Sequence, residues 1–390
     1  MQPKTSVRFD AAAFERLKSR VRDIAQVRRS LHQDPAYATD LPTQIGIKMN
    51  NGCNLRCKHC YEWNTEGYHH LMGRDERKDE IPLELILQVL QATRPTRAKI
   101  YLWGGEPLMY SQFDGFMRLL EKDPRWTTVC TNALLTEEKL DSLLRASESL
   151  AFLASVDGLE EQNDAIRGKG TFRRIVKALD LLLELQRKNI YRGSISVSLT
   201  LNDAAVGQLF EFLEFFEGRG VDSVYLVFPW YIPPYVAQSM DRFVANQLPH
   251  LSPALPTWSK ASWHSFTYHI APENVRALKE EMVRINARVW NMRVRFHPAL
   301  DASEVEDFVI GRPVPAEQKT RCMAITNRVD LLPSGDVVTC KFFPETRVGN
   351  LSSEPLEQIW HNARFVGFRQ TLACGLSPVC SKCTLLYSTG

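Results

Sequence analysis

Asn51-Gly-Cys-Asn-Leu-Arg-Cys-Lys-His-Cys-Tyr61 is the stretch that decides the fold, and it follows a β-branched apolar run at residues 45–49. It places the thiols of Cys53, Cys57 and Cys60 in one tight loop directly after a predicted strand. A cubane 4Fe–4S cluster normally takes four thiolates, so a loop that offers three leaves one iron open to a ligand from outside the protein. The spacing therefore predicts a cluster with one reactive iron.

The alternative for this loop is a structural zinc site. Zinc loops usually use Cys-x2-Cys pairs and complete the tetrahedron with a fourth Cys or His nearby. His59 lies between two of the candidate ligands and is poorly placed to complete it. The spacing and context therefore favour iron and sulfur over zinc.

The sequence on both sides of the loop alternates short apolar runs with longer stretches of helical periodicity. Strands are expected at residues 45–49, 99–103, 127–130, 150–156, 195–201 and 223–228, and helices at 83–93, 113–122, 137–146, 172–185 and 204–216, with a further helix later. Six strand–helix units in succession predict an α/β fold with a parallel sheet, curved into a partial (β/α)6 barrel. Loops at the carboxyl ends of parallel strands carry the chemistry of such folds, and the cysteine loop lies at this rim.

Composition narrows the class of protein. The chain has 390 residues with 48 basic and 45 acidic side chains, which does not suggest a nucleic-acid groove. Its nine cysteines fall in two groups separated by a stretch that holds only Cys130, a pattern that predicts metal in a reducing compartment rather than a disulfide scaffold. Charged residues near the N-terminus rule out a signal peptide there, and no run is long enough to span a bilayer. We expect a soluble, cytoplasmic protein with no membrane or nucleic-acid partner.

Other regions give weaker predictions. An amphipathic helix is expected over residues 11–32, packed on the outside of the main domain by the apolar face Phe14, Leu17, Val21, Ile24 and Val27. The proline- and aromatic-rich stretch 229–272 is expected either to line or cover a substrate cavity or to be a surface insertion that buries its own aromatics. The His69-His70 pair indicates a solvated loop rather than a metal site.

CxxxCxxC followed by an aromatic residue resembles the signature of the radical S-adenosylmethionine (SAM) superfamily, in which the open iron chelates the amino and carboxylate groups of SAM. Trp103-Gly-Gly-Glu-Pro107 follows the second expected strand and resembles the Gly-Gly-Glu motif of that family. The resemblance implies that the backbone of Gly104 and Gly105 and the carboxylate of Glu106 hold the SAM ammonium. Glycines allow the backbone to approach a ligand closely, and a carboxylate accepts hydrogen bonds from a cation.

Further matches to the family are less specific. Tyr61 corresponds to an aromatic near adenine, Asn132 lies in Thr-Asn-Ala where relatives usually read Thr-Asn-Gly, and Arg167 lies in a segment where an arginine often faces SAM or substrate. Ser155 and Asp157 belong to a Ser-x-Asp-Gly that resembles the motif near the SAM ribose. A structural role in caps or turns is the alternative for Asn132, Ser155, Asp157 and Arg167.

The second cysteine group lies in the last 70 residues. Cys322 and Cys340 flank a predicted hairpin at residues 329–339, whose geometry brings its ends together. This hairpin, a Gly-Asn turn, a Leu-x-x-Ile-Trp helix and a final Cys-x2-Cys resemble the SPASM extension, or its shorter twitch form, in radical SAM enzymes. The full pattern has seven cysteines and two clusters, whereas this chain has five, which suffice for one auxiliary 4Fe–4S cluster. The expected ligands are Cys322, Cys340, Cys380 and Cys383, with Cys374 as a spare that could replace one of them, and a zinc ribbon is the alternative.

The resemblance also implies a division into parts and a mechanism. Residues 1–42 would form a helical extension, 43–228 the barrel, 229–319 an aromatic-rich insertion with a closing helix and strand, and 320–390 the auxiliary-cluster domain. One electron from a flavodoxin or ferredoxin would lead to cleavage of SAM, and the resulting 5′-deoxyadenosyl radical would take a hydrogen atom from an unactivated C–H bond. Cys130 corresponds to a thiol that returns a hydrogen atom in some relatives, although a lone cysteine is commonly just a small buried apolar residue.

Three functions are compatible with these motifs. The leading hypothesis is maturation of a ribosomally made precursor peptide through a crosslink, a thioether or a related oxidation. The alternative is a dehydrogenase or epimerase of a small molecule, such as an aminosugar or nucleoside, which a single auxiliary cluster fits slightly better. A third hypothesis makes both cysteine groups zinc sites in a non-enzymatic scaffold.

Overall fold

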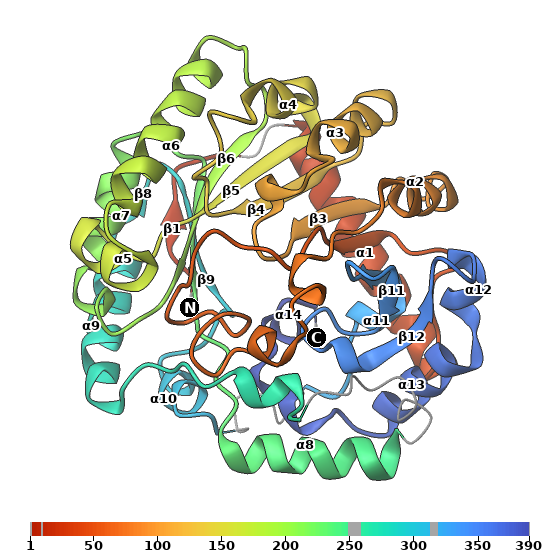
Figure 1. The fold of residues 1–390 in the computed structure, drawn as a ribbon. Helices are drawn as coiled ribbons and strands as arrows, with labels where there is room; N and C mark the ends of the chain where they lie inside the picture. The colour runs from red at the N-terminus through yellow and green to blue at the C-terminus, as the bar shows by residue number, and fades with distance from the viewer. Residues whose placement is uncertain (1, 9–10, 249–258, 313–318, 390) are drawn as a thin grey trace.

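One curved sheet organises the chain (Figure 1), seen in a computed structural model that describes residues 2–8, 11–248, 259–312 and 319–389. Its ten strands follow the order β12-β11-β10-β2-β3-β4-β5-β6-β7-β9. They are β2 (Gln44–Lys48), β3 (Lys99–Trp103), β4 (Thr127–Thr131), β5 (Leu150–Ser155), β6 (Ser194–Thr200), β7 (Ser223–Val227), β9 (Arg293–His297), β10 (Arg328–Leu331), β11 (Asp336–Val338) and β12 (Arg347–Asn350). A separate parallel pair joins β1 (Lys4–Thr5) to β8 (Val289–Trp290).

The strands from β2 to β7 pair in chain order and are parallel throughout, which confirms the predicted α/β partial barrel. No pairing closes the ring between β9 and β12 within the described residues. The helices are α1 (Ala11–Gln33), α2 (Leu83–Ala92), α3 (Phe113–Lys122), α4 (Leu140–Arg145), α5 (Glu160–Arg167), α6 (Thr171–Arg187), α7 (Leu209–Glu217), α8 (Pro234–Gln247), α9 (Val275–Ala287), α10 (Glu304–Val309), α11 (Ala324–Asn327), α12 (Leu356–His361), α13 (Ala363–Cys374) and α14 (Thr384–Thr389).

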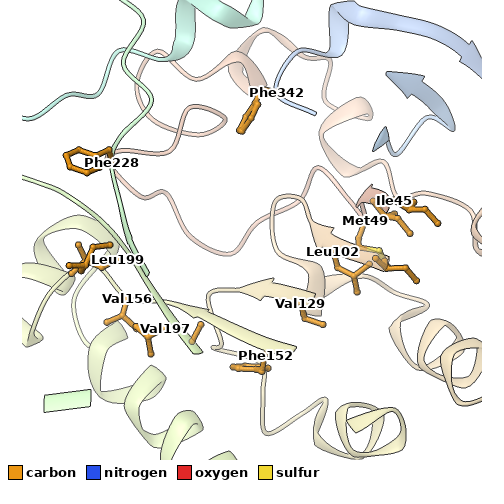
Figure 2. Packing of buried hydrophobic residues seen from close by; sticks show 14 of the residues in the cluster. Ile45, Met49, Leu102, Val129, Phe152, Val156, Val197, Leu199, Phe228 and Phe342 are labelled. Carbon is orange, nitrogen blue, oxygen red and sulfur yellow. The ribbon is translucent and has the colours of Figure 1, made fainter. Parts of the chain in front are cut away.

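Alternation along the strands builds the hydrophobic core between the sheet and its helices. Every second residue is fully buried, as with Leu102 on β3, Val129 on β4 and Phe152 on β5 (Figure 2). Successive strand side chains point to opposite faces, so the intervening residues face the interior of the barrel. The strand residues that can contact a substrate are therefore the ones that alternate with these buried core residues.

The C-terminal hairpin is an extension of the barrel sheet. β10 pairs in parallel with β2, and β11 and β12 continue from it in antiparallel order. The part of the chain that carries the second cysteine group is thus joined by backbone hydrogen bonds to the strand that leads into the first. This pairing spans more than 280 residues of sequence, which local pattern does not reveal.

Two predictions about exposure are only partly right. Of the predicted apolar face of α1, Val27 is buried and packs with Leu31 and Met323, whereas Phe14, Leu17 and Val21 are exposed. In the His69-His70 pair, His70 is exposed as predicted, but His69 is fully buried.

No helix among the described residues is both long and apolar enough to cross a membrane.

Candidate active site

The loop that carries Cys53, Cys57 and Cys60 follows β2 and Asn50, which forms an isolated β-bridge with Glu80. In Figure 1 this segment lies inside the ring of strands and helices. It has no regular secondary structure, because its backbone groups bond to other segments: the Lys58 amide donates to the carbonyl of Ile166 over 3.1 Å. Burial raises the pKa of Cys53 to about 12 and also raises the pKa of Cys57 and Cys60. These thiols would be neutral unless a cationic group compensates them, which is the behaviour expected of metal ligands before loading.

Gly104 and Gly105, directly after β3, let the backbone pack closely against the start of this loop. The Gly105 amide donates to the Asn50 carbonyl over 3.0 Å, and the Glu106 amide donates to the Gly52 carbonyl over 2.8 Å. A Cβ atom on Gly105 would lie 2.0 Å from the carbonyl oxygen of Gly52, and Gly104 has a φ of +147°. Any side chain at either position would therefore push the cysteine loop away from the sheet.

Glu106 joins two strand ends. Its buried carboxylate accepts hydrogen bonds from the Leu108 amide at 2.9 Å, the Thr131 hydroxyl at 2.5 Å and the Asn132 amide at 2.7 Å. Burial raises its pKa, although these three donors oppose the shift. Three of about four lone-pair positions are thus taken in tying the end of β3 to the end of β4, and the contact of this carboxylate with the SAM ammonium stays a prediction.

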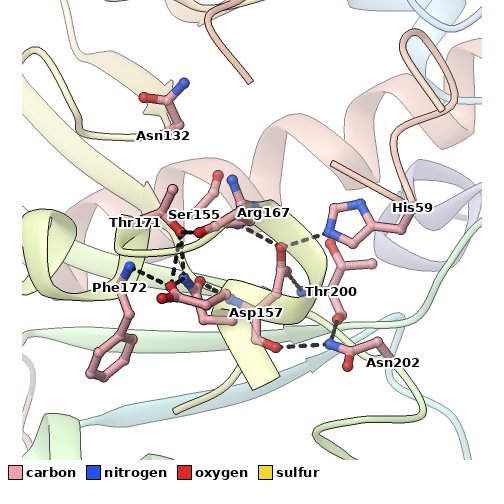
Figure 3. Close-up of polar contacts among 12 residues, drawn as sticks. His59, Asn132, Ser155, Asp157, Arg167, Thr171, Phe172, Thr200 and Asn202 are labelled. Atoms are coloured by element: carbon pink, nitrogen blue, oxygen red, sulfur yellow. Dashed lines mark hydrogen bonds and ion pairs between the residues drawn. The ribbon is translucent and has the colours of Figure 1, made fainter. Parts of the chain in front are cut away.

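Asp157 connects the cysteine loop to the far side of the barrel (Figure 3). Its Oδ2 atom lies 2.6 Å from Nε2 of His59 and 2.6 Å from Nε of Arg167, while the Thr200 amide donates to Oδ1 over 3.0 Å. Burial alone would raise the pKa of Asp157, but Arg167 and His59 outweigh it and hold the pKa well below its usual range. The side chains of Asp157 and Arg167 are thus paired with each other, and both position the loop through His59 and Ile166.

His59 is a site residue that sequence reasoning missed. It was considered only as a zinc ligand, whereas the structure uses it as the link between the loop and Asp157. Its position between Cys57 and Cys60 is the sequence feature that could have indicated a role in holding the loop. Arg167 likewise lies at the end of α5, a helix not expected from the sequence.

Asn132 and Ser155 occupy the ends of neighbouring strands at the same rim. The Asn132 amide side chain donates to Oδ1 of Asn54 in the cysteine loop over 2.7 Å. The hydroxyl of Ser155 lies 4.0 Å from the thiol of Cys130, which is partly exposed to the barrel interior and also borders Tyr101. Cys130 is therefore not a core residue, which keeps its predicted role as a hydrogen donor open to test.

Tyr61 is covered by aromatic residues from two other regions. Its ring stacks on Phe266 with centroids 4.3 Å apart and meets the edge of Phe342, which in turn packs on Trp230 at 3.8 Å. In the described part of stretch 229–272, Trp230 and Phe266 pack between Tyr61 and Phe342, and we call these four side chains the aromatic wedge. That the stretch lines or covers a substrate cavity stays a prediction. Residues 249–258 of this stretch lie outside the described residues.

A buried polar group lies behind the loop. The ammonium of Lys48, at the end of β2, is 2.7 Å from the Glu62 carboxylate, 3.1 Å from the Tyr68 hydroxyl and 2.9 Å from Nε2 of His69. Burial, and then Lys48, hold the pKa of His69 well below its ordinary value, so the imidazole is neutral. Because Lys48 and Glu62 neutralise each other within this group, we assign it a structural role.

The second cysteine group gathers four of its five members. Burial is the largest cause of the raised pKa of each of Cys322, Cys340, Cys380 and Cys383. Cys322 lies close enough to the other three thiols to raise the pKa of each of them further. Cys374, at the end of α13, is exposed to solvent. The neighbourhood supports the four predicted ligands with Cys374 as the spare.

Two buried cations of this region, Lys382 and Arg369, have no acidic side chain within ion-pair distance among the described residues. Lys382, between Cys380 and Cys383, is fully buried with its ammonium on the carbonyl of Arg312, and burial lowers its pKa to about 7. Arg369 is 2% exposed, has an Nη2 atom with no hydrogen-bond partner, and has its pKa lowered to about 10 by burial. Buried cations need a compensating anion. A cluster or ion held by four thiolates is such an anion, so the residues present fit the group that the sequence predicts.

No three His, Cys, Asp or Glu side chains in the described ranges already surround a single point as ligands of a bound ion would. The ligand sets therefore rest on the chemistry and neighbourhood of the thiols and remain proposals.

Comparison with known proteins agrees with this geometry. Residues 47–213 match the family model of the radical SAM superfamily, and residues 322–384 match that of SPASM, an iron-sulfur cluster-binding domain. The chain is similar to the serine-type anaerobic sulfatase-maturating enzyme of Bacteroides thetaiotaomicron, with 23% identity over 86% of this chain and 78% of that protein. It is also similar to the mycofactocin maturase MftC of Mycobacterium ulcerans, with 24% identity over 89% of this chain and 81% of that protein. The crystal structure of Streptococcus suis SuiB bound to its precursor peptide SuiA shares the fold, with a TM-score of 0.59 and 16% identity over 98% of this chain and 79% of that chain.

Proposed function

The chain belongs to the radical SAM superfamily and carries a C-terminal SPASM domain, and on that premise we propose that it matures a ribosomally made peptide by forming a crosslink, a thioether or a related oxidised bond. The observation that carries the proposal is that residues beside both thiol groups meet at Tyr101 and Cys130. Tyr61, next to Cys60, interacts electrostatically with Tyr101 and Cys130, while Lys341, next to Cys340, lies over the ring of Tyr101 and interacts with Cys130 and Cys383. A substrate in that interior would be close to both groups.

The chain's residues divide into ligands and residues that orient. Cys53, Cys57 and Cys60 would hold the first 4Fe–4S cluster together with SAM, and Cys322, Cys340, Cys380 and Cys383 the auxiliary cluster. When bound, these groups supply the one-electron chemistry that removes a hydrogen atom from an unactivated C–H bond.

Other side chains position the reactants and exclude water. The backbone of Gly104 and Gly105, with Asn132 and Ser155 at the next strand ends, would orient SAM at the rim. The aromatic wedge around Tyr61 would keep water from the reacting carbon. The thiol of Cys130 would donate a hydrogen atom to the substrate radical where the reaction requires it.

A peptide substrate is supported by the similar proteins. One matures a sulfatase, one matures mycofactocin, and SuiB is seen with a precursor peptide bound. A small-molecule dehydrogenase or epimerase is the second candidate, favoured by cysteines that suffice for only one auxiliary cluster.

Anaerobic incubation of the reconstituted enzyme with SAM, a flavodoxin or chemical reductant and the peptide encoded beside the gene tests the proposal. We expect 5′-deoxyadenosine to form together with a peptide that has lost two hydrogen atoms, measured by mass spectrometry. A peptide that stays unchanged while an aminosugar or nucleoside stimulates 5′-deoxyadenosine formation would support the second candidate instead.

A further inference from the structure

Lys341 is a cation that contacts Tyr101 and Trp103 of β3 and forms no ion pair with another described residue. Its ammonium lies 4.8 Å from the ring centroid of Tyr101, 5.8 Å from that of Trp103 and 4.7 Å from that of Phe342. Within the described ranges it has no carboxylate within ion-pair distance. Aromatic faces attract a cation but do not accept its hydrogen bonds as an anion does.

Two further donors beside Lys341 are also unsatisfied. The indole nitrogen of Trp103, a residue 7% exposed, is buried without an acceptor, and so is the indole nitrogen of Trp230, which packs on the same Phe342 ring as Lys341. A buried donor without an acceptor costs free energy, and native proteins rarely leave several together. The residues around Lys341 thus include donors, and no side chain among the described residues accepts from them.

Neighbouring charges do not supply that acceptor. Asp330 is held by Arg328 through two nitrogens of the guanidinium, at distances from 2.6 to 3.1 Å, and Glu62 is held by Lys48 at 2.7 Å. Of the remaining groups that act on Lys341, Cys130 and Cys383 are thiols, and Cys383 brings negative charge only as a ligand of the auxiliary cluster. Within the described residues, no carboxylate is therefore left to pair with the Lys341 ammonium.

We propose that Lys341, whose ammonium lies among the rings of Tyr101, Trp103 and Phe342, forms a binding subsite for a carboxylate of the substrate. This rests on the proposed function and specifies it: the peptide would carry an acidic side chain, or its C-terminal carboxylate, close to the reacting C–H bond. Lys341 is in this view a specificity-determining residue. Because the subsite borders Cys130 and lies one residue from Cys340, the anchored carboxylate would fix which carbon faces the reacting centre.

Binding to the reconstituted enzyme, measured by ligand-observed NMR without reductant, tests the subsite directly. The probes are N-acetyl-glutamic acid α-amide, its uncharged glutamine counterpart, and N-acetylglycine as a model of a C-terminal carboxylate. We expect a charged probe to bind about tenfold or more tightly than the glutamine analogue, since hydrogen bonds to charged groups contribute that much. Which of the two charged probes binds identifies the source of the carboxylate.

Variants assign the effect to Lys341. Lys341→Met should remove the preference for the charged probe and Lys341→Arg should keep most of it, whereas Lys177→Met, at a lysine 73% exposed, should change nothing. Equal binding of charged and neutral probes by the native enzyme overturns the proposal, as does an undiminished preference in Lys341→Met. The native comparison decides even if the methionine variant does not fold.

Two parallel measurements separate the other roles that a cation here could have. A loss of SAM affinity in Lys341→Met with unchanged iron content would assign the residue to SAM, and a loss of iron would assign it to the auxiliary cluster, each overturning the subsite. Because the probe measurement needs no turnover, a failure to modify any peptide would count against the proposed function and leave this test intact.

Discussion

The two cysteine groups are built in opposite ways. The first lies within eight residues of sequence, and the acids and bases around it pair with each other: Asp157 with Arg167 and His59, and Lys48 with Glu62. The second comes from positions up to 61 residues apart, between Cys322 and Cys383, and leaves Lys382 and Arg369 buried without an acid among the described residues.

The first site therefore has its charges paired within the chain, whereas the second site needs a bound anion to compensate its buried cations. The first loop is held by hydrogen bonds to residues at three strand ends, Glu106, Asn132 and Asp157, none of which needs a bound cluster. The second group pays a desolvation cost for its cations that only a bound anion offsets. We therefore expect the stability of the C-terminal region, more than that of the barrel, to depend on iron.

The largest expected effect separates the two groups by activity. Cys57→Ala should reduce 5′-deoxyadenosine formation to background, because a cluster with two thiolates left cannot be held in the geometry that SAM needs. Cys380→Ala should leave SAM cleavage measurable and lose the modified product. Chromatography of both products from one anaerobic reaction gives the comparison, with Cys374→Ala as the matched control that should retain both. Intact SAM cleavage in Cys57→Ala would contradict the assignment of the first group.

Asp157→Asn tests whether the first site is held by the chain alone. Removing the carboxylate charge leaves Arg167 buried without its partner, which should cost about 3–5 kcal/mol in the free energy of unfolding. The cost should be the same with and without iron, measured by urea unfolding under anaerobic conditions. Asp114→Asn removes an exposed ion pair to Arg118 and should change the free energy of unfolding far less than Asp157→Asn does. A loss for Asp157→Asn that appears only in the loaded protein would mean that the cluster, and not the chain, organises this network.

Lys382→Met tests the opposite expectation at the second site. In the loaded protein a cluster held by Cys380 and Cys383, which flank Lys382 in sequence, would add negative charge near this lysine, whose ammonium lies on the Arg312 carbonyl. Its removal should therefore cost about 1–2 kcal/mol. In the iron-free protein the same change removes a buried cation without an acid and should be neutral or stabilising. The measurement is the sign of the change in urea unfolding between the two forms, with Lys177→Met as a control that should shift neither. A cost of equal size in both forms would show that Lys382 acts through its aliphatic stem alone.

Much of the barrel could be predicted from the sequence, because each strand and helix has its own local pattern. Residues 99–103 were expected as a strand and form β3 (Lys99–Trp103), and residues 113–122 were expected as a helix and form α3 (Phe113–Lys122). The helix α5 was missed, because its eight residues lie among polar and acidic side chains that bury only part of one face. Short polar helices give little periodicity to read.

Contacts between distant segments were beyond local pattern. The pairing of β10 with β2 and the stacking of Phe266 on Tyr61 depend on how the whole chain closes, and no run of residues announces them. Glu106 shows the same limit within a recognised motif. Its identity could be read from the sequence, but its use as a brace between β3 and β4 follows from which donors surround it.

The smallest expected effect concerns the contact that joins the aromatic wedge to the second group. The Ser262 hydroxyl donates to Oε2 of Glu345 over 2.7 Å, and its amide donates to Oε1 over 2.5 Å, in a buried position just after the segment that carries Cys340. Ser262→Ala removes the first bond and keeps the second, so it should cost about 1 kcal/mol. Hydrogen exchange should then be faster in residues 340–346 and unchanged in residues 53–60, because only the second site depends on this contact, while Ser239→Ala on the exposed face of α8 should alter neither segment. Faster exchange in residues 53–60 as well would show that the aromatic wedge couples the two cysteine sites. The two sites would then differ only in how their charges are compensated.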